Sequence, residues 1–234
     1  MKKTLLATLL AAGAVFCASS AFAADSVDLK VIGTITPVAC IPTLSGGGTV
    51  DYGTIKADTL KVDDYTVLPL KTLDFSITCD GRTKVALQAT NGRIGSLAGV
   101  TEGVTGAAAT PVAFPDLSGS NGAVGLGLDG VAKIGGYGLV INPTSITADG
   151  IAVDAIQWSD SGSTAWTKTT VGSIYNNTLG RRLSWAATGT LIPVTFKIMA
   201  AKLDVQAYIN KTSELDITKP IKLDGLTTLE LVYL

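Results

Sequence analysis

Side chains that could carry chemistry are few, and histidine is absent from the whole chain. Without an imidazole, neither a Ser-His-Asp nor a Cys-His nucleophile system can form, and the commonest zinc and copper ligand is missing. Asp63 with Asp64, or Asp154 with Asp160, are carboxylate pairs to consider for glycoside cleavage, which needs two carboxyl groups about 5 to 10 Å apart. Their linear spacing does not support that role, so solvated loop carboxylates are the expected interpretation. We therefore expect no enzyme activity, no metal and no cofactor.

Tryptophans offer a second kind of chemistry, because an exposed indole can stack on a sugar ring or anchor a protein partner. Trp166 lies in the polar stretch SDSGSTAWTKTT and is the candidate ligand contact. A packed core explains Trp158 and Trp185 at least as well. The stretch GLGLDG, residues 125–130, has the glycine spacing of a dinucleotide-binding turn, but VAKIGGYG follows where a helix is needed. No nucleotide site is expected there.

The start of the chain predicts export. Two lysines precede an apolar run over residues 5–17, and Ala-Phe-Ala at 21–23 fits the small-x-small pattern of a cleavage site. Residues 1–23 are interpreted as a secretory signal peptide, which leaves a domain over residues 24–234 in the periplasm or at the cell surface. The apolar run is short for a membrane span of about 20 residues, and we expect no transmembrane segment.

Cys40 and Cys79 remain beyond the signal peptide. A compartment outside the cytoplasm favours oxidation, so we expect them to form a disulfide, the alternative being two free buried thiols. The formal net charge is −1, and the chain lacks the stripe of basic residues that binding to nucleic acid requires. We therefore expect no nucleic-acid partner.

Strand patterns begin at the predicted mature N-terminus. Residues 26–40, SVDLKVIGTITPVAC, alternate in polarity and predict a strand. One face of this strand would carry Val27, Leu29, Val31, Gly33 and Ile35. Further on, LPLKTLDFSITC at 68–79 and TKVALQAT at 83–90 flank the turn-like DGR, and together they predict a hairpin.

The middle of the chain, residues 92–136, is rich in Gly, Ala, Ser and Thr and predicts long loops around at most one or two short strands. After it, five segments restore strand patterning: GYGLVIN, GIAVDAIQW, RLSWAAT, IPVTFKIMAAKL and TTLELVYL. A weak helical stripe over 200–208 fits a strand equally well. The pattern as a whole predicts an all-β sandwich.

The last eight residues, TTLELVYL, alternate as a half-buried strand does. Chain ends fray unless something holds them, so this strand needs a neighbour in its own domain or in another chain.

Several of these segments together resemble chaperone–usher pilins, the subunits of bacterial fimbriae. The resemblance lies in IGTITPVAC near the mature N-terminus, in a second cysteine on the strand FSITC, and in the closing strand LELVYL with its penultimate tyrosine. Within that group, IGTITPVACIPTLSGGGTVDYG and KLDGLTTLELVYL are similar to the GltF-like set of secreted fimbrial-like proteins, whose domain has no assigned function.

The resemblance implies an immunoglobulin-like, pilin-type sandwich that lacks its last strand, with long Gly/Ala-rich loops in the middle. A periplasmic chaperone, and then the N-terminal extension of another pilin subunit, would fill the resulting groove during assembly at the outer-membrane usher. Leu229, Leu231 and Tyr233 would line the groove edge, and Leu234 would contact the chaperone. The alternating residues 27–35 would be the donor strand or the first strand of the domain.

These observations leave two interpretations of function open. The first is a fimbrial or fimbrial-like structural subunit, assembled by β-strand addition and acting in cell adhesion. The second is a free-standing periplasmic or surface β-sandwich that binds a ligand such as a glycan.

Overall fold

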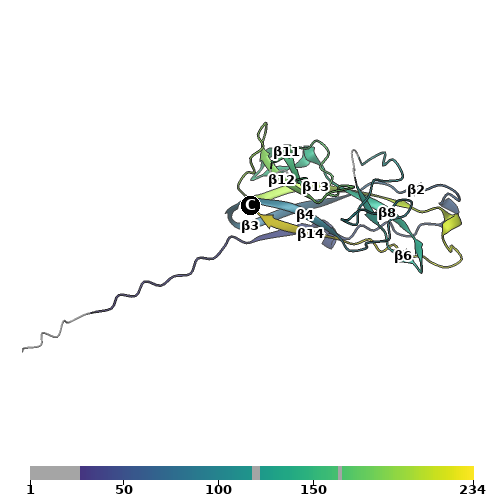
Figure 1. Ribbon diagram of the computed structural model, residues 1–234, viewed down its shortest axis with the longest axis horizontal. Helices are drawn as coiled ribbons and strands as arrows, with labels where there is room; N and C mark the ends of the chain where they lie inside the picture. The colour runs from purple at the N-terminus through teal and green to yellow at the C-terminus, as the bar shows by residue number, and fades with distance from the viewer. Residues whose placement is uncertain (1–26, 118–121, 163–164) are drawn as a thin grey trace, which may run out of the picture. The chain divides into compact units, whose positions relative to one another are not determined.

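The computed structural model describes residues 27–117, 122–162 and 165–234 (Figure 1). The predicted signal peptide, residues 1–23, lies outside the described residues. Contacts divide the chain into two units, Met1–Thr36 and Pro37–Leu234. Among the described residues no helix is long and apolar enough to cross a membrane.

The described part of the first unit, residues 27–36, contains no strand, so the prediction of a domain strand there is wrong. Its alternating apolar side chains Val27, Leu29, Val31 and Ile35 are 89% to 98% exposed. An alternating pattern yields a strand only where a neighbouring strand completes the ladder, because β-propensity depends on pairing and packing more than on the backbone itself.

The second unit is all-β, as predicted. Its long strands are β1 (Cys40–Leu44), β3 (Lys71–Thr83), β4 (Val85–Asn91), β8 (Gly135–Ile141), β10 (Ile151–Ser159), β12 (Arg181–Ala187), β13 (Phe196–Ile209) and β14 (Thr227–Tyr233). The short ones are β2 (Thr66–Val67), β5 (Ala123–Gly125), β6 (Leu128–Asp129), β7 (Ala132–Lys133), β9 (Thr147–Ala148) and β11 (Thr167–Lys168). Helical structure in the described residues is limited to 3-10 turns at Ser45–Gly48, Ala57–Thr59, Pro143–Ser145 and Thr212–Glu214.

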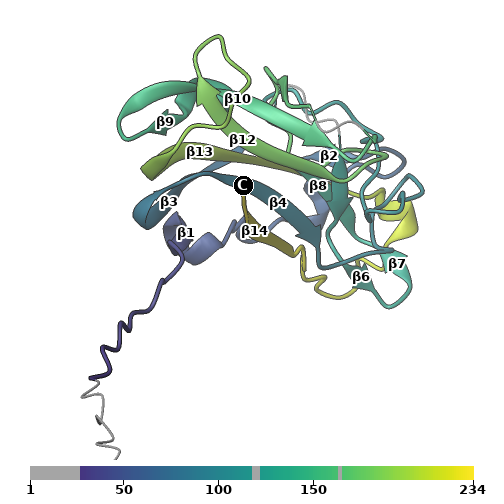
Figure 2. The same cartoon turned by 60° about the vertical axis from the view of Figure 1, so that its left-hand side comes forward.

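One sheet curls through most of this unit in the strand order β1-β3-β13-β9-β10-β12-β4-β14. Strand β10 joins its two halves, pairing with β9 on one side and with β12 on the other. The curl brings the two end strands, β1 and β14, to the same side of the unit (Figure 2). The result is a sandwich close to a barrel, interrupted between its first and last strands.

Consecutive strands β3 and β4 do not form the predicted hairpin. β3 pairs with β1 and β13, whereas β4 pairs with β12 and β14 in the other half of the sheet. The DGR stretch at 80–82 stays extended within β3, and Asp80 N donates to the carbonyl of Ala39, just before β1. Among the described residues of the middle segment, three short strands, β5, β6 and β7, precede β8, where at most two were predicted.

The core lies between the two halves of the sheet. Trp185 on β12 is 1% exposed and meets Phe196 on β13 edge to face, with ring centroids 5.8 Å apart. Such contacts between the two halves bury the apolar side chains that point inward from each strand. This burial is the main source of stability in a sandwich. Trp185 is therefore a core residue.

The predicted disulfide is confirmed. Cys40 and Cys79 are bonded and lie directly opposite each other in the β1–β3 register. A disulfide fits a secreted or periplasmic protein, because such compartments keep cysteines oxidised.

Candidate strand-accepting groove

Strand β14 lies at an edge of the sheet and pairs with β4 from Thr227↔Asn91 to Tyr233↔Val85. At the two ends of this ladder Gly92 N donates to Leu226 O, and Leu234 N donates to Lys84 O. In an antiparallel pair, residues that bond to the neighbour alternate with residues whose backbone groups face the other way. The even-numbered residues of β14 therefore bond to β4, and the N–H and C=O groups of Leu229, Leu231 and Tyr233 face the open edge.

Strand β1 lies at the opposite edge and pairs with β3. Because Asp80 N donates to Ala39 O, the same alternation turns the backbone groups of Cys40, Pro42 and Leu44 toward the open side. Pro42 has no N–H to offer there, and proline in a sheet is tolerated at such edges. An incoming strand would find a fuller row of partners on β14 than on β1.

A hollow of about 340 Å³ lies between these edges and is called the edge groove below. Leu44 forms one wall and Leu229 the other. Its floor is made of inward-facing side chains of β3, β8 and β13: Leu73, Leu139, Leu203, Val205 and Ala207. The walls and floor are thus largely aliphatic, which suits the alternate apolar side chains of an added strand.

A second hollow, of about 870 Å³, continues from the edge groove and shares Thr49, Val50, Tyr52 and Leu223 with it. It runs between the segments 49–60 and 215–223. Ile55, Leu60, Leu215 and Ile221 line it and are only partly buried against the core. Burial raises the pKa of Tyr52 to about 12, so this phenol stays neutral and acts as part of the wall.

Tyr233 bridges the two edges near one end of the groove. The N–H of Cys40 donates to its hydroxyl oxygen at 2.8 Å, and the tyrosine side chain remains 50% exposed. This contact uses one of the backbone donors that β1 turns toward the open side.

Hydroxyl groups hold the beginning of β14. The hydroxyls of Tyr137 and Thr227 lie 2.7 Å apart, and Tyr175 donates to Thr227 Oγ1 at 3.1 Å. Burial raises the pKa of Tyr137 to about 12 and raises that of Tyr175 as well, so both hydroxyls stay protonated at neutral pH. These hydrogen bonds therefore fix the position of Thr227, the first residue of β14.

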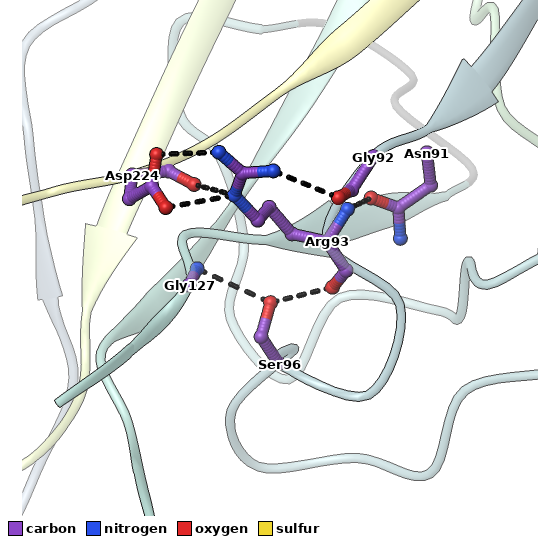
Figure 3. Close-up of polar contacts among 6 residues, drawn as sticks. All are labelled: Asn91, Gly92, Arg93, Ser96, Gly127 and Asp224. Carbon is purple, nitrogen blue, oxygen red and sulfur yellow. Dashed lines mark hydrogen bonds and ion pairs between the residues drawn. The ribbon is translucent and has the colours of Figure 1, made fainter. Parts of the chain in front are cut away.

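An arginine clamp fixes the segment just before β14 (Figure 3). Arg93 donates from Nε and Nη2 to the two carboxylate oxygens of Asp224, at 2.8 and 2.7 Å, and from Nε to the Asp224 carbonyl. This bidentate pairing holds the pKa of Asp224 below its usual range. Ser96 extends the clamp by accepting from Gly127 N and donating to Arg93 O (Figure 3).

Of the terminal residues singled out from the sequence, Leu229 lines the edge groove. Leu231 is half-buried further along β14, and Tyr233 and Leu234 are each 50% exposed. Trp166 is half-buried just before β11 and lines none of the hollows described here. Sequence reasoning missed Arg93 and Asp224, which are 131 residues apart and carry no local motif. It also missed the hollow walls at 49–60 and 215–223.

Within residues 27–117, 122–162 and 165–234, no cluster of three or more Cys, Asp or Glu side chains is placed to hold a metal ion.

Comparison with known proteins gives three matches. A family model described as a protein of unknown function (DUF1120) matches residues 29–138. The chain is 32% identical to protein GltF of Escherichia coli K12, over 100% of this chain and 99% of GltF. It is 31% identical to the uncharacterized protein YhcF of the same organism, over 97% of this chain and 98% of YhcF.

Proposed function

We propose that this chain, which belongs to the family of Escherichia coli protein GltF, is a non-catalytic fimbrial-like subunit that accepts a β-strand from another protein chain. The observation that carries this proposal is the open edge of β14 beside the edge groove. Backbone donors and acceptors of Leu229, Leu231 and Tyr233 face the open edge, and Leu229 also lines the edge groove with its aliphatic floor. An unpaired strand edge beside an apolar groove is the combination that strand addition uses. As part of the same proposal, we assign the sandwich to the immunoglobulin-like, pilin type.

Residues 27–36 are the candidate donor strand. Their apolar side chains alternate and are almost fully exposed, and they pair with no strand in the described chain. Ten extended residues span about 33 Å, which is longer than the seven residues of β14. In another subunit this segment would place Val27, Leu29, Val31 and Ile35 against the groove floor, with Gly33 on the same face.

The partners follow from the same proposal. A periplasmic chaperone would occupy the groove first, other pilin subunits would replace it at the usher, and the assembled protein would stand in a fimbrium at the cell surface. The tyrosine bridge between Tyr233 and Cys40 would be remodelled as the strand enters, because it spans the gap between β1 and β14.

Peptide binding tests the proposal. A peptide with the sequence of residues 27–36 is added to the purified chain, and its effect on Tm and on hydrodynamic size is measured. Saturation at 100 times Kd would stabilise the folded state by about 2.7 kcal/mol, since only the folded groove binds. A peptide with serine at the four alternating apolar positions is the control.

Matched variants on neighbouring residues locate the binding. Leu229→Ser changes a groove wall and should abolish the peptide effect, whereas Glu230→Ser changes the exposed outward face of the same strand and should preserve it. Equal loss in both variants, or an effect of the serine peptide equal to that of the native one, would refute strand addition in this groove.

A free-standing ligand-binding module is the second candidate function. It is favoured by a separate hollow between β4 and β12, lined by Trp158 and two arginines. A chain that is stable and monomeric by itself, with no response to the peptide, would favour this candidate.

A further inference from the structure

A third hollow, of about 340 Å³, opens where β4 and β12 separate and is called the arginine hollow below. The two strands pair only at Arg182↔Gln88 and Leu183↔Leu87. Beyond these residues β4 continues toward Asn91 while the chain before β12 turns away, leaving a space that opens to solvent beside Asp160. The volume lies within the range of small-molecule sites.

Arg181 forms part of the wall and is 8% exposed. Its Nη1 donates to the carbonyl of Ser173 at 2.9 Å, but its Nε has no hydrogen-bond partner among the described residues. No described carboxylate forms an ion pair with it, and burial lowers its pKa. A buried cation without a counter-charge is costly, so the site favours an incoming anion.

Arg93 shows how the same edge of a guanidinium engages an anion in this molecule. Its Nε and Nη2 hold the two oxygens of the Asp224 carboxylate at 2.8 and 2.7 Å. In Arg181 the Nε atom of this edge has no acceptor among the described residues. A guanidinium edge of this kind matches a carboxylate in shape and in charge.

Thr105 provides a second observation in the same hollow. Its hydroxyl is buried and also lacks a hydrogen-bond partner among the described residues. A buried polar atom left unpaired costs about 1 to 3 kcal/mol, and folded proteins leave few of them. Two such atoms around one hollow indicate that a polar molecule completes it.

Trp158 and Arg182 shape the remaining wall. The guanidinium of Arg182 lies 4.9 Å from the ring centroid of Trp158, and its Nε donates to Gln88 at 3.0 Å. The indole gives a ligand an apolar surface, and the second guanidinium makes the hollow more favourable for an anion despite the exposed Asp160 at its mouth.

We propose that the arginine hollow binds a small organic carboxylate, held by the Nε edge of Arg181 with the Thr105 hydroxyl as a second partner. The ligand is an acidic sugar or a simple dicarboxylate, which share this chemistry. The inference is independent of strand addition, because none of the residues involved lines the edge groove.

Titration calorimetry on the full exported chain, with D-glucuronate, succinate and D-glucose in separate arms, tests the proposal. At least one carboxylate should bind at least tenfold more tightly than glucose. Glucuronate binding tighter than succinate would identify the acidic sugar, and the reverse order would identify the dicarboxylate. Glucose binding as tightly as both carboxylates, or no binding of either carboxylate at millimolar concentration, would overturn the proposal and leave a hollow filled by water.

Substitutions of Arg181 distinguish binding by the guanidinium group from binding by positive charge alone. Arg181→Gln and Arg181→Lys should both weaken carboxylate binding at least tenfold, since lysine keeps the charge but not the fork. Arg82→Gln is the control, because Arg82 is an exposed arginine paired with Asp149 outside the hollow. If the Arg181 variants do not fold, the Nε–H resonance of Arg181 in the unaltered chain should shift on adding the carboxylate and not on adding glucose. A resonance that does not move would refute the assignment.

Discussion

The Tyr233 hydroxyl accepts a hydrogen bond from the N–H of Cys40, across the gap between the edge strands β14 and β1. Tyr233→Phe removes this contact and leaves the ring. The loss should be about 1 kcal/mol, the usual net value of one hydrogen bond. For a chain of this size the corresponding fall in Tm is about 2 to 4 °C, measurable by calorimetry. An unchanged Tm would mean that water replaces the tyrosine at no cost.

Asp224 should make stability depend on acid pH. Its pKa is lowered by the hydrogen bonds and charge of Arg93, so the stabilisation is complete above the unfolded value of about 3.9 and is lost as pH falls through the folded pKa. Asp224→Asn removes this contribution at neutral pH, and its unfolding free energy should therefore fall less between pH 5 and pH 3. Urea unfolding at each pH measures the difference.

Asp58→Asn is the matched control for the acid prediction, because Asp58 lies exposed in the turn Ala57–Thr59. It should keep the pH dependence of the unaltered chain. The lowered pKa values of Asp64, Asp149, Asp154 and Asp216 are common to all three proteins and cancel in the comparison. Identical pH profiles for Asp224→Asn and the unaltered chain would contradict the clamp's contribution.

The alternation of buried and exposed residues along a strand predicts the burial of Arg181 but not the pairing of Arg93 with Asp224. In RRLSW, Leu183 and Trp185 occupy core positions, so a period of two places Arg181 on the core side, where a buried guanidinium needs an explanation. That signal was present in the sequence. The pairing of Arg93 with Asp224 was not predictable, because it depends on how the curled sheet brings residues 131 apart together.

At the scale of elements, β1 depends on its disulfide more than the other strands do. It has five residues, lies at an edge and contains Pro42, so few ladder bonds hold it. A crosslink over a sequence separation of 39 residues lowers unfolded-chain entropy by an amount worth roughly 4 kcal/mol. Reduction should lower Tm by several degrees, and a Cys40→Ser, Cys79→Ser double variant should melt at that lower temperature with or without reductant. Equal melting of the oxidised and reduced chains would contradict the prediction.

Strand existence was predictable at this scale, but strand partners were not. The all-β class, the late strands and the terminal strand followed from period-two patterns. The hairpin assigned to β3 and β4 failed, since adjacency in sequence says nothing about which half of a curled sheet receives the next strand. The strand predicted over residues 27–36 is also absent. These residues have the pattern of a strand, but the described chain offers them no partner strand.

For the whole molecule, the interrupted sheet sets the decisive question of whether the folded unit is stable by itself. The groove leaves aliphatic side chains only partly buried beside an unpaired strand edge, and such edges promote aggregation. Expressed in a periplasm that lacks pilus chaperones, the chain should be degraded or aggregated. A coexpressed chaperone, which covers the same edge, should restore soluble protein, measured as yield and oligomeric state.

A self-complemented variant tests the same expectation without a chaperone. Adding the sequence VDLKVIGTIT after Leu234 through a flexible Gly/Ser linker supplies a strand at high effective concentration, which converts binding into an intramolecular step. This variant should accumulate as a monomer with a single cooperative melt, and the version with serine at its four alternating apolar positions should not. If instead the unextended chain is already a stable monomer and the added strand leaves its Tm unchanged, the sheet is complete without a donor. The chain would then act as a free-standing binding module.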